Sequence, residues 1–209
     1  MWKAYYYLSI VTGMRRGEIC PLHWTDVDFD TKKVTIVKST TLTHDGPIIK
    51  EPKTVASTRE ITVTDETIKR LKDWYEEEKA YYNENIGSWA NKDVSRFEDN
   101  YIFIQKDGRM IHPTTPSNKF KEIIARHNER ADQDNQIKDI KLHALRHTCA
   151  SLLIEEGVDI LTVSKRLGHS KISTTLDIYT HRLKKDDHEA TDAMSRILGS
   201  KERSDSRKS

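Results

Sequence analysis

The sequence predicts an α+β fold that is mostly α-helical and contains a small three-stranded antiparallel sheet. Apolar residues recur at helical spacing through most of the 209-residue chain. The exception is the stretch 33–63, which is rich in β-branched residues and contains the turn signal Asp45-Gly46-Pro47. An apolar fraction of 35% and a charged fraction of 33% suit one globular domain with a heavily charged surface.

In the first half of the chain, helices flank the predicted sheet. We expect helices at 2–11, from about 17 to between 22 and 24, and at 65–82. Strands are expected at 33–42, 47–53 and 57–63. Gly13 ends the first helix, and Pro21 is compatible with the second helix only in its first turn, where a backbone N–H has no helical partner.

In the second half of the chain, helices dominate. They are expected at about 117–130, 142–156, 159–167, 173–180 and 189–198, with one short strand at 101–104. Asp159 is a good N-cap for its helix, and Gly168 is a typical residue to end it. The polar stretch 83–100 reads as a loop or insertion, and the charged residues 199–209 as a disordered tail.

The predicted domain covers residues 1–198. The first helix is apolar from Trp2 onward and has no capping residue, which indicates a chain cut from something longer. Cys20 and Cys149 provide no disulfide framework, so we expect a reduced, cytoplasmic protein. Neither a membrane span nor a signal peptide is visible, so we expect no membrane contact. The net charge of +2 permits DNA binding but argues for it only weakly.

Four segments carry side chains that could do chemistry, and each also has an ordinary structural explanation. They contain Arg15 with Glu18, Lys53, His143 with Arg146, and His169 followed ten residues later by Tyr179. An isolated arginine three residues before a glutamate is usually a surface ion pair, and a lysine on a strand edge usually prevents aggregation. A tyrosine near a helix end is usually half-buried packing. No segment identifies a site by itself.

A zinc site is the alternative explanation for the histidines. His143 and His147 have the i, i+4 spacing of a helical zinc pair. The glutamate that metalloprotease helices place after the first histidine is missing, because Ala144 occupies that position. We therefore expect no metal, and a metal analysis that finds zinc would favour a histidine metalloenzyme instead.

Taken in chain order, the segments resemble the signatures of the tyrosine recombinase (phage integrase) family, most closely integrases of phages and of conjugative or integrative elements. The matching segments are the first arginine box 12–19, the motif 24–28, the lysine hairpin 52–61, the second arginine box 143–148, and the nucleophile segment 167–179. The resemblance covers roughly residues 1–185. At Ala144 the family commonly has Asp, a position outside its catalytic set.

The resemblance implies a tyrosine recombinase catalytic-domain fold and a site-specific recombinase. Such an enzyme cleaves and rejoins DNA through a covalent 3′-phosphotyrosine, and thereby integrates or excises a mobile element. The implied catalytic residues are Arg15, Lys53, His143, Arg146, His169 and the nucleophile Tyr179, with Glu18 holding Arg15 in place. Two guanidiniums suit this chemistry, because the transition state concentrates negative charge on the phosphate oxygens and each planar fork can bind two of them.

The resemblance also implies partners. These are a double-stranded DNA attachment site, other copies of the protein in a tetramer on that DNA, and an accessory DNA-bending or excision factor. Neither ATP nor a metal is implied, because the phosphotyrosine keeps the bond energy for rejoining. Family members carry a separate core-binding domain before the catalytic one, and we expect it to be absent from these residues.

Three other functions compete with this hypothesis. A type IB topoisomerase shares the nucleophile chemistry, but the hairpin from Lys53 to Arg59 and the short spacing from His169 to Tyr179 favour an integrase. Chromosome-dimer resolvases of the Xer type usually carry a Gly-Lys-Gly hairpin, which is missing here. A DNA-binding module without activity, or a decayed element, is disfavoured because all six catalytic residue types are present.

Overall fold

The computed structural model describes residues 1–50, 58–90, 94–169 and 171–180. Its helices are α1 (Trp2–Thr12), α2 (Arg16–Ile19), α3 (Asp65–Asn85), α4 (Thr115–Asn128), α5 (Ala144–Glu155), α6 (Ile160–Leu167) and α7 (Ser173–Thr180). Its strands are β1 (Val27–Asp28), β2 (Lys33–Ile36), β3 (Ser39–Thr43), β4 (Gly46–Lys50) and β5 (Arg59–Thr62). The chain is thus mostly helical with small antiparallel sheets, as predicted.

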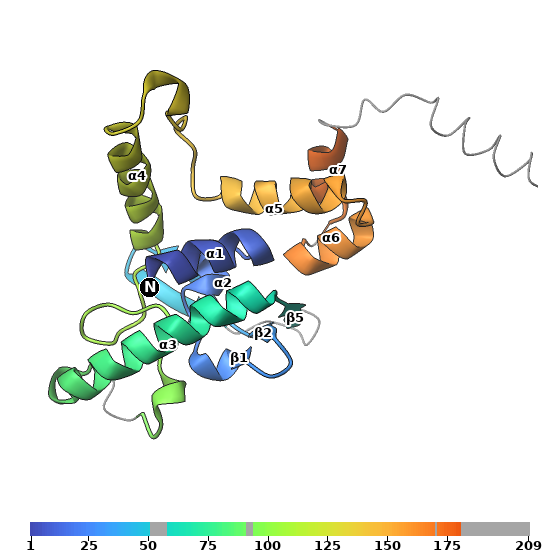
Figure 1. Ribbon diagram of the computed structural model, residues 1–209. Coiled ribbons are helices and arrows are strands. Elements are labelled where there is room, and N and C mark those ends of the chain that lie inside the picture. The colour runs from blue at the N-terminus through green and yellow to red at the C-terminus, as the bar shows by residue number, and fades with distance from the viewer. Residues whose placement is uncertain (51–57, 91–93, 170, 181–209) are drawn as a thin grey trace, which may run out of the picture.

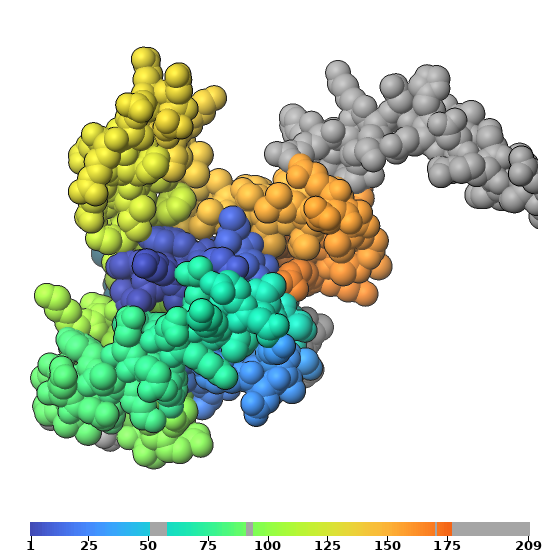
Figure 2. Space-filling view, viewed as in Figure 1, coloured from blue at the N-terminus to red at the C-terminus, as the bar shows by residue number. Residues whose placement is uncertain are grey.

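Helix α1 lies at the centre of the molecule. It packs against α3 on one side and α5 on the other, while α6 and α7 gather at the C-terminal end of α5 (Figure 1). In the space-filling view, the surface is hollowed between the yellow residues around α4 and the orange helices (Figure 2). Residues far apart in the sequence therefore meet where α1 ends.

A three-stranded antiparallel sheet is present, but its strands are not the three that were predicted. Its order is β1-β2-β5, with Val34 of β2 opposite both Val27 and Ile61. The expected strand 33–42 is two strands, because β3 leaves this sheet and pairs with β4 in a separate hairpin. Val27, Val34 and Ile61 are buried, whereas most of the hairpin is exposed, so burial selects the members of the core sheet.

The main core lies between α1, α3 and this sheet, and a smaller one lies between α5 and α6. Among the fully buried large side chains are Tyr5, Leu8, Trp24, Leu71 and Phe103. The smaller cluster consists of Cys149, Ala150, Val163 and Leu167. Both cores adjoin the turn that follows α1.

The expected second helix is shorter than predicted. Helix α2 is a single turn that ends at Ile19, and Trp24 begins a separate 3₁₀ turn, Trp24–Asp26. Pro21 explains the break, since it has no N–H to donate and its ring would clash with the carbonyl four residues earlier. The prediction that one helix carries Ile19, Leu22 and Trp24 is therefore wrong, although all three side chains are buried.

Two further expectations fail in the middle of the chain. The run 101–104 is not a strand but makes isolated bridges, His23 with Tyr101 and Ile104 with Met110. The stretch 83–100 is only partly a loop: α3 continues to Asn85, and the buried Trp89 donates from Nε1 to Asn100 Oδ1 at 2.8 Å. The burial of Trp89 could not be predicted, because a single aromatic residue in a polar stretch gives no periodic hydrophobic pattern.

The signals predicted at the beginnings and ends of helices are confirmed. The side chain of Asp159 accepts a hydrogen bond from the Thr162 N–H at 2.9 Å, and Gly168 ends α6 with φ of 69°. Gly13 ends α1 with φ of 63°. The expected helix 189–198 and the tail 199–209 lie outside the described residues. Within the described part of the chain, no helix combines the length and apolarity needed to cross a membrane.

Candidate active site

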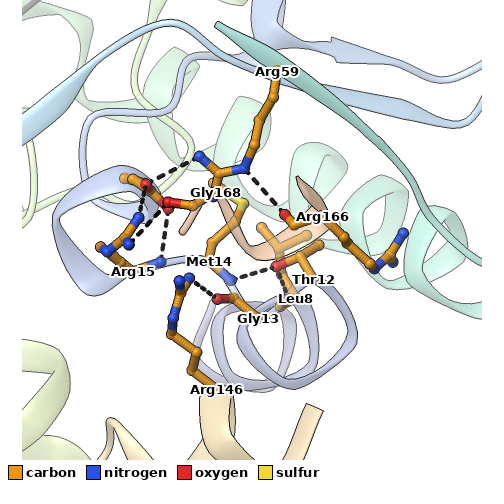
Figure 3. Close-up of polar contacts among 10 residues, drawn as sticks. Leu8, Thr12, Gly13, Met14, Arg15, Arg59, Arg146, Arg166 and Gly168 are labelled. Carbon is orange, nitrogen blue, oxygen red and sulfur yellow. Dashed lines mark hydrogen bonds and ion pairs between the residues drawn. The ribbon is translucent and has the colours of Figure 1, made fainter. Parts of the chain in front are cut away.

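The site is built on the tight turn after α1. Gly13 adopts a left-handed conformation, and a Cβ placed on it would lie 2.3 Å from Leu167 Cδ2 and 3.2 Å from Cys149 Sγ. Glycine is therefore required both for the backbone angle and for the close approach of α5 and α6. The turn is braced by Thr12 Oγ1, which donates to Leu8 O at 2.6 Å and accepts from Met14 N–H at 3.3 Å (Figure 3).

Arg15 follows this turn and caps α2. Its backbone N–H donates to Glu18 Oε2 at 2.8 Å, and its Nη1 donates to Glu18 Oε1 at 3.0 Å. Its Nη2 donates to the Gly168 carbonyl at 3.0 Å. The Arg15 side chain is 43% exposed and that of Glu18 only 8%, so a buried carboxylate holds a guanidinium whose outer side faces solvent.

Arg146 approaches from α5 and is buried, with 4% of its surface exposed. Its Nη1 donates to the Gly13 carbonyl at 2.6 Å, whereas its Nη2 has no hydrogen-bond partner among the described residues. Burial, and then the charge of Arg15, lower the pKa of Arg146 to about 10, so the guanidinium is still charged at neutral pH. A buried charge with an unused donor is costly unless an anion binds it.

His143 stands at the N-terminal end of α5, one turn before Arg146. Its ring meets that of His147 edge-to-face, with centroids 4.8 Å apart. Partial burial, and then the charges of His147, Arg146 and Arg15, lower its pKa, which favours the neutral imidazole. No group of three His, Cys, Asp or Glu side chains that could hold a metal occurs within the described ranges.

Arg15, His143 and Arg146 line one cavity of about 340 Å³. It lies where α1, α2, α4 and α5 meet, and its wall also contains Arg16 and Ser117, joined by a hydrogen bond of 3.1 Å from Nη1 to Oγ. Arg16 adds positive charge to this wall, a role that was not predicted from the sequence. The cavity can accommodate an anionic group.

His169 lies at the exit of α6, next to the Gly168 carbonyl that binds Arg15. Its ring Nδ1 is 2.8 Å from the hydroxyl of the buried Thr175, and its backbone N–H donates to Ser164 O at 3.1 Å. Burial, and then Arg146 and Arg15, lower the pKa of His169 to about 4. It is therefore neutral at physiological pH in the protein without DNA.

Two of the proposed catalytic side chains are not placed. Tyr179 belongs to α7, which packs against α5 and α6, but its side chain is outside the described part. Lys53 falls in the gap 51–57, outside the described residues. The structure thus brings together Arg15, Glu18, His143 and Arg146, and places His169 beside them.

Arg59 is part of this cluster and was not predicted from the sequence, although it lies within the hairpin motif 52–61. From β5 it donates to both carboxylate oxygens of Glu18, at 3.1 and 2.8 Å, and to the Arg166 carbonyl at 3.1 Å (Figure 3). One signal was available: a buried carboxylate has two oxygens, and the Arg15 guanidinium binds only one of those of Glu18. A second cation for Glu18 could have been expected, but nothing in the sequence identified it.

Comparison with known proteins agrees with the fold and the motifs. The chain is 31% identical over 198 residues to the ICEBs1 integrase of Bacillus subtilis (strain 168), which covers 95% of this chain and 50% of that protein. It is 33% identical over 208 residues to a XerC-like tyrosine recombinase of Caldanaerobacter subterraneus subsp. tengcongensis, covering 94% and 49%. The chain spans about half the length of the curated relatives it matches.

Solved structures confirm the predicted catalytic-domain fold. The Tn1549 transposon integrase in complex with transposon right end DNA superposes with a TM-score of 0.72 at 21% identity, over 94% of this chain and 58% of that one. XerA recombinase superposes with a TM-score of 0.61 at 20% identity, over 95% and 57%. The phage integrase family matches residues 2–186, nearly the whole chain. The chain therefore belongs to the phage integrase family.

Proposed function

We propose that this chain is the catalytic part of a site-specific DNA recombinase that integrates or excises a mobile element. Residues 1–198 form its catalytic domain, and a core-binding domain is not among them. Tyr179 attacks a DNA phosphodiester and becomes linked to the 3′ phosphate, and the freed 5′ hydroxyl leaves. Attack of a different 5′ hydroxyl on the phosphotyrosine then exchanges the strands.

The observation that carries this proposal is the buried Arg146, whose Nη2 has no partner in the described part of the chain, in a cavity shared with Arg15 and His143. Two charged guanidiniums facing one cavity favour a phosphate, which accepts hydrogen bonds on several oxygens at once. These donors gain most where negative charge develops, on the non-bridging oxygens of the transition state. The ordinary alternative, a buried ion pair, does not fit, because Arg146 pairs with no carboxylate among the residues that the structure describes.

The remaining residues divide the proton transfers and the positioning. His143 assists proton removal from Tyr179, whose hydroxyl would otherwise ionise only near pH 10. Lys53 protonates the departing 5′ oxygen. His169 donates a hydrogen bond to the phosphate from Nε2, in the tautomer whose Nδ1 accepts from the Thr175 hydroxyl. Glu18 fixes Arg15 through two hydrogen bonds.

The proposed partners are those that the resemblance to the family implies. The substrate is a double-stranded attachment site, on which the protein assembles as a tetramer with an accessory DNA-bending or excision factor. Tyrosine recombinases generally need no cofactor, and we propose that this protein uses neither ATP nor a metal. We propose a cytoplasmic location, where the protein would act on chromosomal DNA.

The test uses the full-length protein that carries this chain, as wild type and as Tyr179→Phe. Nicked duplexes prepared from DNA flanking its gene lose a short fragment on cleavage, so the covalent complex cannot religate. We expect wild type to form a protein–DNA adduct that survives denaturation and Tyr179→Phe to form none. DNA binding without any adduct would contradict the proposal, and relaxation of supercoiled DNA without strand exchange would favour the topoisomerase alternative.

A further inference from the structure

Arg59, Glu18 and Arg15 form a chain of charged contacts that reaches from the core sheet to the cavity. Arg59 belongs to β5, Glu18 to α2, and Arg15 caps α2. Both Glu18 oxygens are shared: Oε1 accepts from Arg15 Nη1 and Arg59 Nη1, and Oε2 accepts from the Arg15 N–H and Arg59 Nη2. Figure 3 draws the polar contacts of Arg15 and Arg59 as dashed lines.

Arg59 is itself anchored at two points. Its Nε donates to the Arg166 carbonyl at 3.1 Å, near the end of α6. Its guanidinium also lies against Gly168, where an added Cβ would be 2.6 Å from Nη1 and 2.7 Å from Cζ. Only a residue without a Cβ leaves this space, so the backbone after α6 is shaped around Arg59. With a side chain only 15% exposed, Arg59 has little freedom to move.

Glu18 depends on this anchor for its charge. Burial alone would raise the pKa of Glu18, but the hydrogen bonds and charge of Arg59, followed by those of Arg15, bring it below its ordinary value. The Arg15 side chain is 43% exposed, whereas that of Arg59 is 15% exposed, so Arg59 is the more firmly held of the two partners of Glu18. Without Arg59, the contacts of Glu18 among the described residues would come from Arg15 alone, and both side chains would gain freedom.

We propose that Arg59 is a positioning residue for strand cleavage, which fixes Arg15 through Glu18 and does not touch the phosphate. This inference rests on the proposed function, in which Arg15 binds the scissile phosphate. A lysine at position 59 would keep the charge but lose the planar fork that contacts both Glu18 oxygens. Because Arg15 must meet the developing charge in a fixed geometry, small displacements cost rate rather than DNA affinity.

The test is a kinetic double-mutant cycle on nicked duplexes, with the full-length protein as wild type, Arg59→Lys, Arg15→Ala and the double variant. We expect Arg59→Lys to slow single-turnover cleavage by on the order of 10²-fold, with the dissociation constant for DNA unchanged. In the Arg15→Ala background, Arg59→Lys should slow cleavage far less, because the group it positions is gone. Arg96→Lys, at an exposed arginine that also pairs with a carboxylate, Asp99, is the matched control.

The cycle separates positioning from general stability. A variant that merely folds poorly would lose the same factor in both backgrounds, and equal factors would overturn the inference even if Arg59→Lys melts early. Full-rate cleavage by Arg59→Lys would also overturn it, while the wild-type adduct would still support the proposed function. If wild type forms no adduct, the proposed function falls and this inference falls with it.

Discussion

At the scale of single residues, the site is defined by a buried positive charge without a full set of partners. Arg146 is 4% exposed, uses Nη1 on the Gly13 carbonyl, and leaves Nη2 without a partner in the described part of the structure. Its pKa falls to about 10 through burial and the nearby Arg15, yet it remains protonated at neutral pH. An incoming phosphate would satisfy the unused donor and offset the repulsion between the two arginines.

Replacing Arg146 with lysine tests this account of the phosphate clamp. Lysine keeps the positive charge but has no planar fork that could donate to the Gly13 carbonyl through one nitrogen and present a second nitrogen to the transition state. We expect Arg146→Lys to slow cleavage of nicked duplexes by on the order of 10²–10³-fold, by analogy with the loss of an oxyanion donor. Thermal unfolding should show a retained fold, and near-wild-type cleavage would contradict the assignment.

His169 should make stability depend on pH. Burial, and then Arg146 and Arg15, lower its pKa from 6.5 to about 4, so below pH 6.5 the unfolded chain binds a proton that the folded chain does not. The stability contributed by the neutral imidazole is therefore complete above pH 6.5 and is lost as the pH falls toward 4. We expect the melting temperature to fall between about pH 7.5 and about pH 5.

His169→Gln should reduce that fall, because glutamine does not titrate. The fully exposed His44, replaced by glutamine, is the control and should leave the fall unchanged. A fall of the same size in His169→Gln as in wild type would assign the pH dependence to other groups, among them His143, whose pKa is also lowered.

At the scale of elements, the turn after α1 joins both cores to the site. The carbonyl of Gly13 accepts a hydrogen bond from Arg146. The Cα of Gly13 faces Leu167 and Cys149, which leave no room for a Cβ. Gly13→Ala combines a left-handed backbone angle with an overpacked contact, and we expect it to lower the free energy of unfolding by roughly 2–5 kcal/mol. Denaturant unfolding measures this loss.

Gly87 supplies the matched control. It lies in the 3₁₀ turn Ile86–Ser88, and an added Cβ would meet no atom within 4 Å. Gly87→Ala should change the free energy of unfolding by no more than about 0.5 kcal/mol. If Gly13→Ala lowers the free energy of unfolding as little as Gly87→Ala, the turn after α1 tolerates a side chain.

The sequence predicts the elements that depend on local signals and misses those that depend on distant contacts. Asp159 and Gly168 delimit α6 through bonds within a few residues, so their types suffice. The expected strand 33–42 divides into β2 and β3 because β2 pairs with β5, whereas β3 pairs with β4. The buried position of Trp89 depends on its hydrogen bond to Asn100. Neither partner follows from propensity.

The site shows the same division. Arg15 and Glu18 are three residues apart, and their contact is a local one. Arg59 reaches Glu18 across 41 residues, and a lone arginine at the end of a hairpin motif gives no sign of that partner. Family resemblance supplied the set of catalytic types, but it did not supply the residue that holds one of them.

At the scale of the whole molecule, the fold gathers segments from both ends of the chain. Helices α5, α6 and α7 pack on one another, and α5 also packs on α1 (Figure 1). Arg146 of α5 and the residues just after α6, Gly168 and His169, therefore lie beside the turn that carries Arg15, and Tyr179 belongs to α7. The site therefore requires both cores to be folded. The net charge of +2 does not reveal this positive site, in which Arg15, Arg16, Arg59 and Arg146 lie close together.

The most direct test of the central claim is to identify the residue that becomes joined to DNA. The denatured adduct of the full-length protein is digested with nuclease and trypsin, and its peptides are analysed by mass spectrometry. Cleavage after Lys171 and Arg182 releases the peptide 172–182, whose only tyrosine is Tyr179. The account predicts a nucleotide remnant on that tyrosine. A remnant on any other residue would contradict it.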